Sequence, residues 1–373
     1  MKSLLFAVLL SSPFLLFSQS PNAVIKYNEA VGQSKLKNYK EAISLYSKAL
    51  EIDPLYHAPY FGRGSAKMAL KDYSEAIRDF SKCIKLKDTH AKANYYKGYC
   101  LMKTDENKDA LSSFTKAIKL DPSLEKAYYY RAFIQMEQKR YELAVLDFLA
   151  YNKIVKDNEK AYFNLGICYQ KQKLNDRAIA AYSTAINLKE GYRKPRLERL
   201  RLNFKEKNYN AVIDDCNFLI NANNKDDDAY NYRSMSHLKN GDYDLAQADF
   251  KILVSLEPDN IRHWTNKGIN SIKQKNYKEA VTDYSKLIEL EPKKVAHIKN
   301  RSVSYIQLED WDNALTDLNM LIEMSPNNGD AFYNRSNVHL QLKENDKACE
   351  DMREAGKLGF DQAFNYIAGL CGQ

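Results

Sequence analysis

Residues 261–294 read IRHWTNKGINSIKQKNYKEAVTDYSKLIELEPKK, and this stretch contains the pattern that decides the fold. Its defining residues are Trp264, Gly268, Ala280, Tyr284 and Pro292. The alanine recurs every 34 residues along the chain, at Ala42, Ala76, Ala110, Ala144, Ala178, Ala246, Ala280, Ala314 and Ala348. The one skipped position on this grid holds Val212. A strict period of this length indicates an array of helical repeats.

We number positions from 1 within each repeat. The ten repeats begin at Ala23, His57, Ala91, Glu125, Glu159, Arg193, Asp227, Ile261, Val295 and Gly329. Position 8 is small in nine repeats, position 20 holds the alanine series, and position 24 is mostly aromatic. Positions 4, 8 and 11 form one stripe of a first helix, and positions 20, 24 and 27 form one stripe of a second. We expect the residues at positions 8 and 20 to face each other where the helices cross, with the aromatic ring beside the crossing.

This pattern resembles that of the tetratricopeptide repeat family, W-x2-L-G-x2-Y, then A-x3-F, then P. The fifth repeat shows it through Leu165, Gly166, Tyr169, Ala178 and Tyr182. The resemblance covers ten repeats and nearly the whole chain after the N-terminal segment. It implies an all-α fold, a right-handed α-solenoid of helix-turn-helix repeats whose first helices line a concave groove.

The sixth repeat departs from the pattern. Leu200 replaces the small residue, Val212 the alanine and Cys216 the aromatic residue. From this repeat on, position 27 changes from mostly small residues to leucine in four successive repeats. A larger residue there should alter the spacing of the helices. We therefore expect two half-arrays, residues 23–190 with repeats 1–5 and residues 191–362 with repeats 6–10, followed by a capping helix over 363–371.

The first 18 residues differ from the rest of the chain. Lys2 precedes an apolar run from Leu4 to Phe17, as in a secretory signal peptide over residues 1–18. The run is short for a membrane-spanning helix, which needs about 20 apolar residues. A retained anchor and a chance apolar start are the alternatives. The segment predicts export to the periplasm or the medium, most simply in a bacterial envelope, and no cysteine follows it to carry a lipid anchor.

Six cysteines raise the question of disulfides in an exported chain. Four of them occupy positions that hold small or aromatic core residues in other repeats: Cys83, Cys100, Cys168 and Cys216. Cys349 and Cys371 are the one pair considered for a bridge, and the sequence leaves that bridge open. No CxxC or Cys/His ligand spacing appears, so no metal site and no cofactor are expected.

Two charged positions occur together within the repeats. Arginine stands at position 7 in six repeats, and all six carry aspartate at position 23: Arg63/Asp79, Arg131/Asp147, Arg199/Asp215, Arg233/Asp249, Arg301/Asp317 and Arg335/Asp351. Lys267 and Asp283 match in the same way. The co-occurrence predicts an ion pair between the two helices, with shared ancestry of the repeats as the alternative. If the pair is buried, Asp249→Ala should cost about 3–5 kcal/mol by stranding the arginine.

The family geometry places positions 5, 9 and 12 of each first helix on the groove. In repeats three to five these positions hold Tyr95, Tyr99, Met102, Tyr129, Phe133, Met136, Phe163 and Ile167. A wall this apolar exceeds what solubility requires, and tyrosine offers contact area with a polar tip. We predict a partner-binding face here. Packing against the neighbouring first helix and stacking on sugar rings are the alternatives.

The first helix of the sixth repeat is strongly basic. It offers a candidate patch for an acidic partner, formed by Arg193, Lys194, Arg196, Arg201 and Lys205. A solvated helix face is the simpler interpretation. The formal net charge of +8 is modest for 373 residues, so no nucleic-acid partner is expected.

No catalytic pattern is evident. A glycine-rich phosphate loop or a nucleophile elbow would need a preceding strand, and no strand is predicted. His237 and His339 share a position that holds core residues elsewhere, so neither is expected to be catalytic. The sequence predicts a non-enzymatic scaffold that binds a protein or peptide segment in the cell envelope. A cell-wall or polysaccharide-binding module and an accessory subunit of an envelope or secretion complex are the alternatives.

Overall fold

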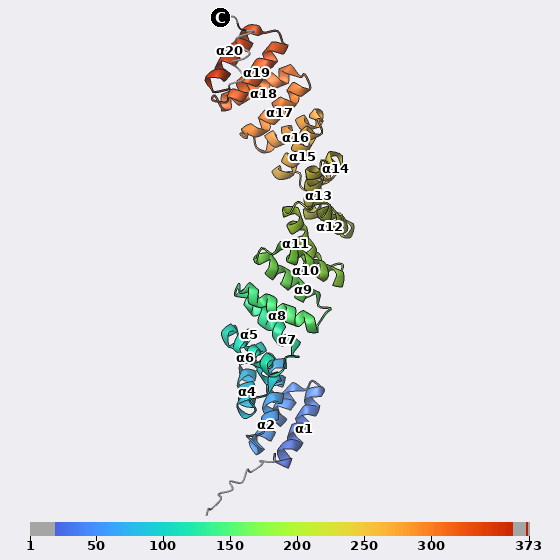
Figure 1. Cartoon of the computed structure of the whole chain (residues 1–373), viewed down its shortest axis with the longest axis vertical. Helices are drawn as coiled ribbons and strands as arrows, with labels where there is room; N and C mark the ends of the chain where they lie inside the picture. Colours follow the sequence, from blue (N-terminus) through green and yellow to red (C-terminus); the bar gives the residue numbers. More distant parts are fainter. Residues whose placement is uncertain (1–18, 361–370, 372–373) are drawn as a thin grey trace, which may run out of the picture. The chain divides into compact units, whose positions relative to one another are not determined.

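The computed structural model describes residues 19–360 and residue 371. These residues form twenty α-helices and no strand. The first helices of the repeats are α1 (Pro21–Lys35), α3 (His57–Ala69), α5 (Ala91–Lys103), α7 (Glu125–Glu137), α9 (Glu159–Lys171), α11 (Arg193–Lys205), α13 (Asp227–Asn240), α15 (Ile261–Lys273), α17 (Val295–Gln307) and α19 (Gly329–Gln341). The second helices are α2 (Tyr39–Ile52), α4 (Tyr73–Leu86), α6 (Asn107–Leu120), α8 (Tyr141–Ile154), α10 (Asn175–Leu188), α12 (Tyr209–Ala222), α14 (Tyr243–Leu256), α16 (Tyr277–Leu290), α18 (Trp311–Met324) and α20 (Asn345–Lys357). Figure 1 shows them in chain order.

Within each unit of the chain, a first helix packs on the second helix of its repeat, and that helix packs on the next repeat. This confirms the predicted all-α repeat fold. The chain divides into two compact units, Met1–Pro195 and Arg196–Gln373, which we call the N-unit and the C-unit. Their boundary falls inside α11. The predicted signal segment at 1–18 and the predicted capping helix, up to residue 370, lie outside the described residues.

The helix crossing explains why position 8 is small. Every position-20 alanine is buried, as is Val212 at the skipped position. A Cβ added to Gly166 would lie 2.4 Å from the ring of Tyr182, and one added to Gly98 would lie 2.9 Å from the ring of Phe114. The ring at position 24 therefore packs directly against position 8, and the backbone of position 20 lies close by, 3.2 Å from the same added Cβ at Gly98. A larger residue at position 8 would displace the ring.

The turn between the two helices has the same conformation in all ten repeats. Position 15 has a positive φ throughout: Lys37, Lys71, Asp105, Lys139, Lys173, Lys207, Gly241, Lys275, Glu309 and Lys343. The following N–H donates to a carbonyl five residues earlier, as in the 2.9 Å bond from Asn38 to Gln33. This is the Schellman ending of a helix, which usually uses glycine at the left-handed position. Only Gly241 does so here.

The predicted ion pairs form in all six arginine repeats. The guanidinium of Arg233 donates to Asp249 through Nη2 at 2.7 Å and through Nε at 2.9 Å. The seventh pair, Lys267 with Asp283, also forms. Each aspartate at position 23 of these repeats is buried. The sequence-based prediction of a buried pair between the helices is confirmed.

The arginines also join consecutive repeats, which the sequence analysis missed. In five of them, Arg63, Arg131, Arg233, Arg301 and Arg335, Nη1 donates to the residue at position 25 of the preceding repeat: Ser47, Thr115, Asn217, Ser285 and Asn319. Position 25 is Leu149 before the repeat that has Leu165 in place of arginine. The polar or apolar character of these two positions therefore changes together.

The C-terminal pair that the sequence left open is bonded. Cys349 and Cys371 form a disulfide with a Cα–Cα distance of 5.5 Å. The other four cysteines are free thiols and buried, as their positions in the repeat indicated.

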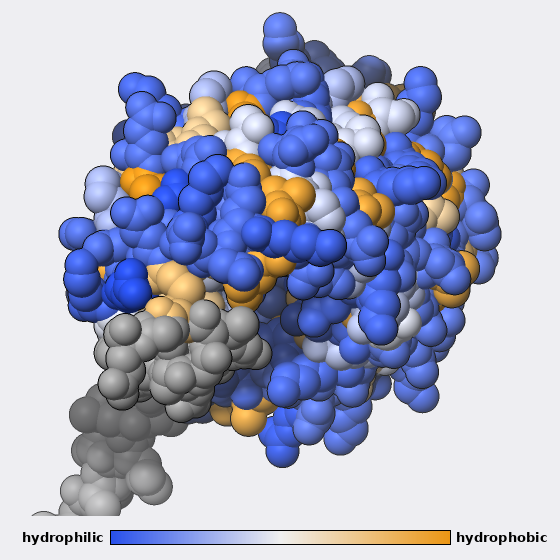
Figure 2. All heavy atoms as spheres, turned by 90° about the horizontal axis from the view of Figure 1, so that it is seen from above, coloured by the Kyte–Doolittle hydropathy of each residue, from blue (hydrophilic) through white to orange (hydrophobic). Residues whose placement is uncertain are grey.

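The face of the molecule drawn in Figure 2 is mostly hydrophilic, and its apolar side chains are scattered among polar ones. Over residues 19–360 and 371, none of the helices combines the length and the apolar character that crossing a membrane requires.

Candidate partner-binding face

The predicted groove residues lie on α5, α7 and α9, and all of them are half-buried: Tyr95, Tyr99, Met102, Tyr129, Phe133, Met136, Phe163 and Ile167. None is among the largely exposed apolar side chains of the described residues. Each ring is thus partly covered by the protein and partly available. This is an intermediate between the open groove and the packed interface that the sequence analysis weighed.

The side chain at position 5 packs against an aromatic ring at position 24 of the same repeat. Tyr95 lies 6.1 Å from Phe114, Tyr129 lies 5.9 Å from Phe148, and Phe163 lies 5.9 Å from Tyr182, measured between ring centroids. The same pairing occurs in repeats one and two, at 5.9 Å in both. All five repeats of the N-unit therefore contain a ring pair between positions 5 and 24, which orients the position-5 side chain.

Further rings, which the sequence analysis did not select, extend this face. Tyr130 of α7 contacts Tyr99 at 5.2 Å and Tyr95 at 6.4 Å, so it links α5 to α7. Tyr129 lies 5.2 Å from Tyr151. The available signal was the run Tyr128–Tyr130, three consecutive tyrosines in one helix. Half-buried rings that contact one another have few rotamers left to lose when a partner binds.

The hydroxyls of Tyr95 and Tyr129 stay protonated at neutral pH. Burial raises the pKa of Tyr95 and of Tyr129, and neighbouring tyrosines act in the same direction. A hydrogen bond with Asn164 lowers the pKa of Tyr129 by less than burial raises it. The hydroxyls can therefore donate and accept hydrogen bonds at the edge of an apolar wall.

A pocket of about 250 Å³ opens between α5 and α7. Its lining residues are Lys92, Tyr95, Tyr96, Leu124, Glu125, Lys126 and Ala127. It combines an aromatic wall with charges of both signs at the rim. The volume suits one large side chain of a bound segment.

Only some residues of the predicted basic patch lie on the surface. Arg196 is 7% exposed, donates to Asp215 at 2.9 Å and stacks 3.7 Å above the ring of Phe218. Its charge is held inside the repeat, so it does not belong to a partner-binding patch. Arg201 is exposed and pairs with Glu198 at 2.7 Å. The other members, Arg193, Lys194 and Lys205, are exposed.

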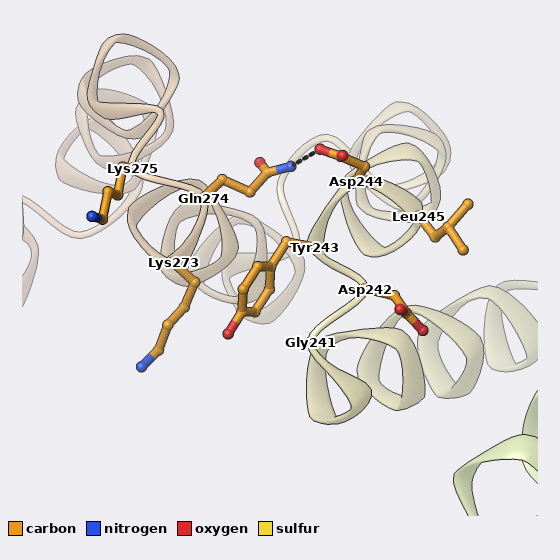
Figure 3. A pocket seen from close by; sticks show the side chains of 8 residues that line it. All are labelled: Gly241, Asp242, Tyr243, Asp244, Leu245, Lys273, Gln274 and Lys275. Carbon is orange, nitrogen blue, oxygen red and sulfur yellow. Dashed lines mark hydrogen bonds between the residues drawn. The ribbon is translucent and has the colours of Figure 1, made fainter.

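A larger pocket lies elsewhere, in the C-unit (Figure 3). It has a volume of about 600 Å³ and is lined by the turns of repeats seven and eight: Gly241, Asp242, Tyr243, Asp244, Leu245, Lys273, Gln274 and Lys275. Gln274 donates to Asp244 across it at 2.7 Å. Its lining is polar turn structure that no sequence-based prediction selected, and its charges do not converge on a common point (Figure 3). It therefore offers no stronger candidate than the aromatic face.

Comparison with known proteins matches the repeats to two family models. The model described as the ETO1 C-terminal domain matches residues 86–343, more than half of the chain. The model of the tetratricopeptide repeat matches residues 26–54 and 58–90. A search of curated proteins gave no match.

Solved structures show the same fold. The C-terminal part of a TPR repeat-containing protein from Cytophaga hutchinsonii is 21% identical, with a TM-score of 0.53, over 64% of this chain and 98% of that one. A chain of Naa15/Naa10 bound to HypK-THB is 13% identical, with a TM-score of 0.50, over 90% of this chain and 64% of that one. At such identities the likeness concerns the fold alone.

Proposed function

Because this chain belongs to the tetratricopeptide repeat family, we propose that it is a non-enzymatic scaffold that binds a protein or peptide segment on the first helices of repeats three to five. The observation that carries the proposal is the half-burial of eight apolar side chains on α5, α7 and α9. Side chains of this kind, fixed on one side and open on the other, are typical of the aromatic anchors of binding interfaces.

The chemistry of the face favours an extended segment with apolar side chains. The pocket beside Tyr95 accepts one such side chain, and Lys92, Glu125 and Lys126 at its rim can pair with charges that flank it. The neutral tyrosine hydroxyls can bond the main chain of the segment.

We also propose that the protein works outside the cytoplasm, in a cell envelope. The predicted signal segment at 1–18 supports this location, and so does the Cys349–Cys371 disulfide, because disulfides persist in oxidising compartments. Fractionation of cells that express the full chain, compared with a form lacking residues 1–18, tests it. Equal recovery of both forms in the cytoplasm would contradict it.

The partner-binding proposal is tested with Tyr99→Ser/Phe133→Ser. Both residues occupy position 9, where repeat two holds Ser65, so serine is compatible with the fold. The matched control is Ile269→Ser at position 9 of repeat eight, in the C-unit, where the side chain is 38% exposed. Wild type and both variants are used as bait in envelope extract, before and after protease treatment of the extract.

We expect the double variant to lose a protein partner that the control retains. Removing two aromatic anchors at about 2 kcal/mol each, about 4 kcal/mol together, should lower the affinity roughly 700-fold. Retention of every partner by the double variant would refute the aromatic face. A partner that survives protease, or sediments with cell-wall material, would support polysaccharide binding instead.

A further inference from the structure

Three side chains of repeat two that can ligate metals lie together in the N-unit. His57 begins α3, Cys83 lies in α4, and His90 immediately precedes α5. One ligand atom of each lies within 4.8 Å of the others. The sequence predicts no metal site here, because these residues lack a known ligand spacing. The stacking of α3, α4 and α5 brings them together.

The local environment leaves a coordinating atom of His57 unused. Its Nδ1 is buried and has no hydrogen-bond partner. The His57 and His90 rings lie 6.0 Å apart. Nδ1 of His90 accepts a hydrogen bond from the N–H of Ala93 at 3.1 Å. Other buried side-chain atoms of the described residues also have no hydrogen-bond partner, but Nδ1 of His57 belongs to the group formed with Cys83 and His90, where an ion would satisfy it.

The protonation states suit a metal ligand set. Burial lowers the pKa of both imidazoles, and the charge of Lys87 acts in the same direction, so both rings are neutral at neutral pH. Burial raises the pKa of the Cys83 thiol to about 11, against the opposing effect of Lys87. A metal ion would displace the thiol proton, as it does at thiolate sites generally.

The fold itself does not require these three side chains. Position 1 is alanine in repeats one and three, and position 27 is alanine in repeats one, three and five. Position 34 is asparagine in repeats four, seven and nine, at Asn158, Asn260 and Asn328, and each of these caps the next helix. Repeat two alone combines His, Cys and His at these positions.

We propose that His57, Cys83 and His90 form a binding site for Zn²⁺ in the second repeat. Two imidazoles and one thiolate match the nitrogen and sulfur ligands that zinc prefers, and they leave a fourth position for water. Zinc bonds of about 2.0–2.3 Å place tetrahedral ligand atoms about 3.3–3.6 Å apart, so the side chains close in by about 1 Å on binding. Binding releases the proton of Cys83 to solvent.

The test uses the full chain, freed of metal, and Zn²⁺ or Co²⁺ alone as the probe. Calorimetry measures zinc binding, and the absorption of bound Co²⁺ reports sulfur ligation through a thiolate-to-cobalt charge-transfer band. The variants are Cys83→Ala, His57→Ala and His90→Asn, each of which places a residue that another repeat already carries at that position. The control is Cys100→Ala, since Cys100 is an equally buried thiol of the same core cluster and Ala66 occupies its position in repeat two.

We expect one zinc per chain, and a thiolate band with Co²⁺ that Cys83→Ala abolishes and Cys100→Ala retains. Both histidine variants should weaken zinc binding at least tenfold. Zinc should raise the melting temperature of wild type but not of Cys83→Ala. Zinc binding that is unchanged in Cys83→Ala, or a Co²⁺ complex without a thiolate band, would overturn the site.

Discussion

The N-unit and the C-unit use one backbone repeat but fill it with different chemistry. In the N-unit, all five repeats have an aromatic pair between positions 5 and 24, and only two have the buried Arg–Asp pair. In the C-unit, all five repeats have a buried ion pair. Position 5 there is mostly aliphatic or polar, at Leu197, Asn231, Thr265, Lys299 and Tyr333.

The difference shows that the helix crossing fixes the repeat while the flanking contacts are interchangeable. Buried alanine at position 20 is common to both units, apart from Val212. In the N-unit every repeat adds a ring pair, and repeats two and four add an ion pair as well, whereas in the C-unit every repeat adds an ion pair. Ring pairs leave apolar surface beside the first helices, whereas ion pairs direct charge inward. In the N-unit, Tyr130 joins the rings of α5 and α7 into one aromatic surface.

The largest effect should come from breaking an ion pair of the C-unit. Asp249→Ala leaves Arg233 with Asn217 as its remaining partner, at 2.6 Å. We expect a loss of about 3 kcal/mol, the lower end for a buried pair, because the Arg233 side chain retains 21% exposure. Denaturant unfolding followed by tryptophan fluorescence measures it, since Trp264 and Trp311 both lie in the C-unit.

A double variant distinguishes the cost of leaving one charge unpaired from the cost of losing the whole ion pair. Arg233→Leu/Asp249→Ala copies repeat five, which has Leu165 and Ala181 at these positions. Replacing both charges by apolar groups is often neutral, so most of the lost stability should return. A double variant as unstable as Asp249→Ala would show that the repeats are not interchangeable in this respect.

A smaller effect should follow from removing one ring of the N-unit. Phe163→Ala loses its contacts with Tyr182 at 5.9 Å and Tyr192 at 5.5 Å. Because Phe163 is half-buried, we expect a cost of about 2 kcal/mol, below that of a fully buried ring. The equivalent change in the C-unit, Thr265→Ala, should stay within about 0.5 kcal/mol. Hydrogen exchange in α9 and in α15 measures the two losses of stability. Equal losses would contradict the difference between the N-unit and the C-unit.

The smallest effect should be a difference in acid sensitivity. The hydrogen bond from Asn260 lowers the pKa of Glu257. Burial raises the pKa of Glu279, but its hydrogen bonds with Lys267 and Gln247, together with the charges of Lys267 and Lys251, outweigh burial, so the net shift is downward.

Both carboxylates belong to the C-unit, as does Glu344, whose pKa is lowered by its hydrogen bonds with Lys347 and His339. Against these, the hydrogen bonds of Ser123 lower the pKa of Asp121 in the N-unit, and burial raises the pKa of Asp283 in the C-unit. Since the folded pKa of each of the three glutamates lies below the ordinary value of 4.5, their stabilisation is complete above that pH and is lost as the pH falls through the folded value.

Between pH 5 and pH 3, the stability of the C-unit, measured by denaturant unfolding followed by tryptophan fluorescence, should therefore fall more than the stability of α7 to α10, measured by hydrogen exchange. Glu279→Gln should flatten the pH dependence of the C-unit. A parallel fall in both units would show that the aromatic repeats are equally sensitive to acid.

The sequence predicted the repeat, its crossing and its ion pairs because each leaves a mark at a fixed period. It missed the third partner at position 25, although the change from serine, threonine or asparagine to Leu149 was visible beside Leu165. The sequence also placed Arg196 in the basic patch. Its residue type does not reveal that this side chain is buried in the repeat whereas the other members of the patch are exposed. The His57, Cys83 and His90 cluster could not be predicted, since those side chains meet only when α3, α4 and α5 stack.

The left-handed turn between the helices has an electrostatic consequence. At nine of its ten occurrences the chain accepts a conformation that costs a residue other than glycine about 1–2 kcal/mol. Seven of these residues are lysines, and all seven are exposed: Lys37, Lys71, Lys139, Lys173, Lys207, Lys275 and Lys343. Each unit thus carries a row of cations at the C-terminal ends of its first helices, where a positive charge complements the helix dipole. Such a row attracts anionic surfaces over a range of about 10 Å at 0.1 M salt. This attraction does not depend on which partner the first helices bind.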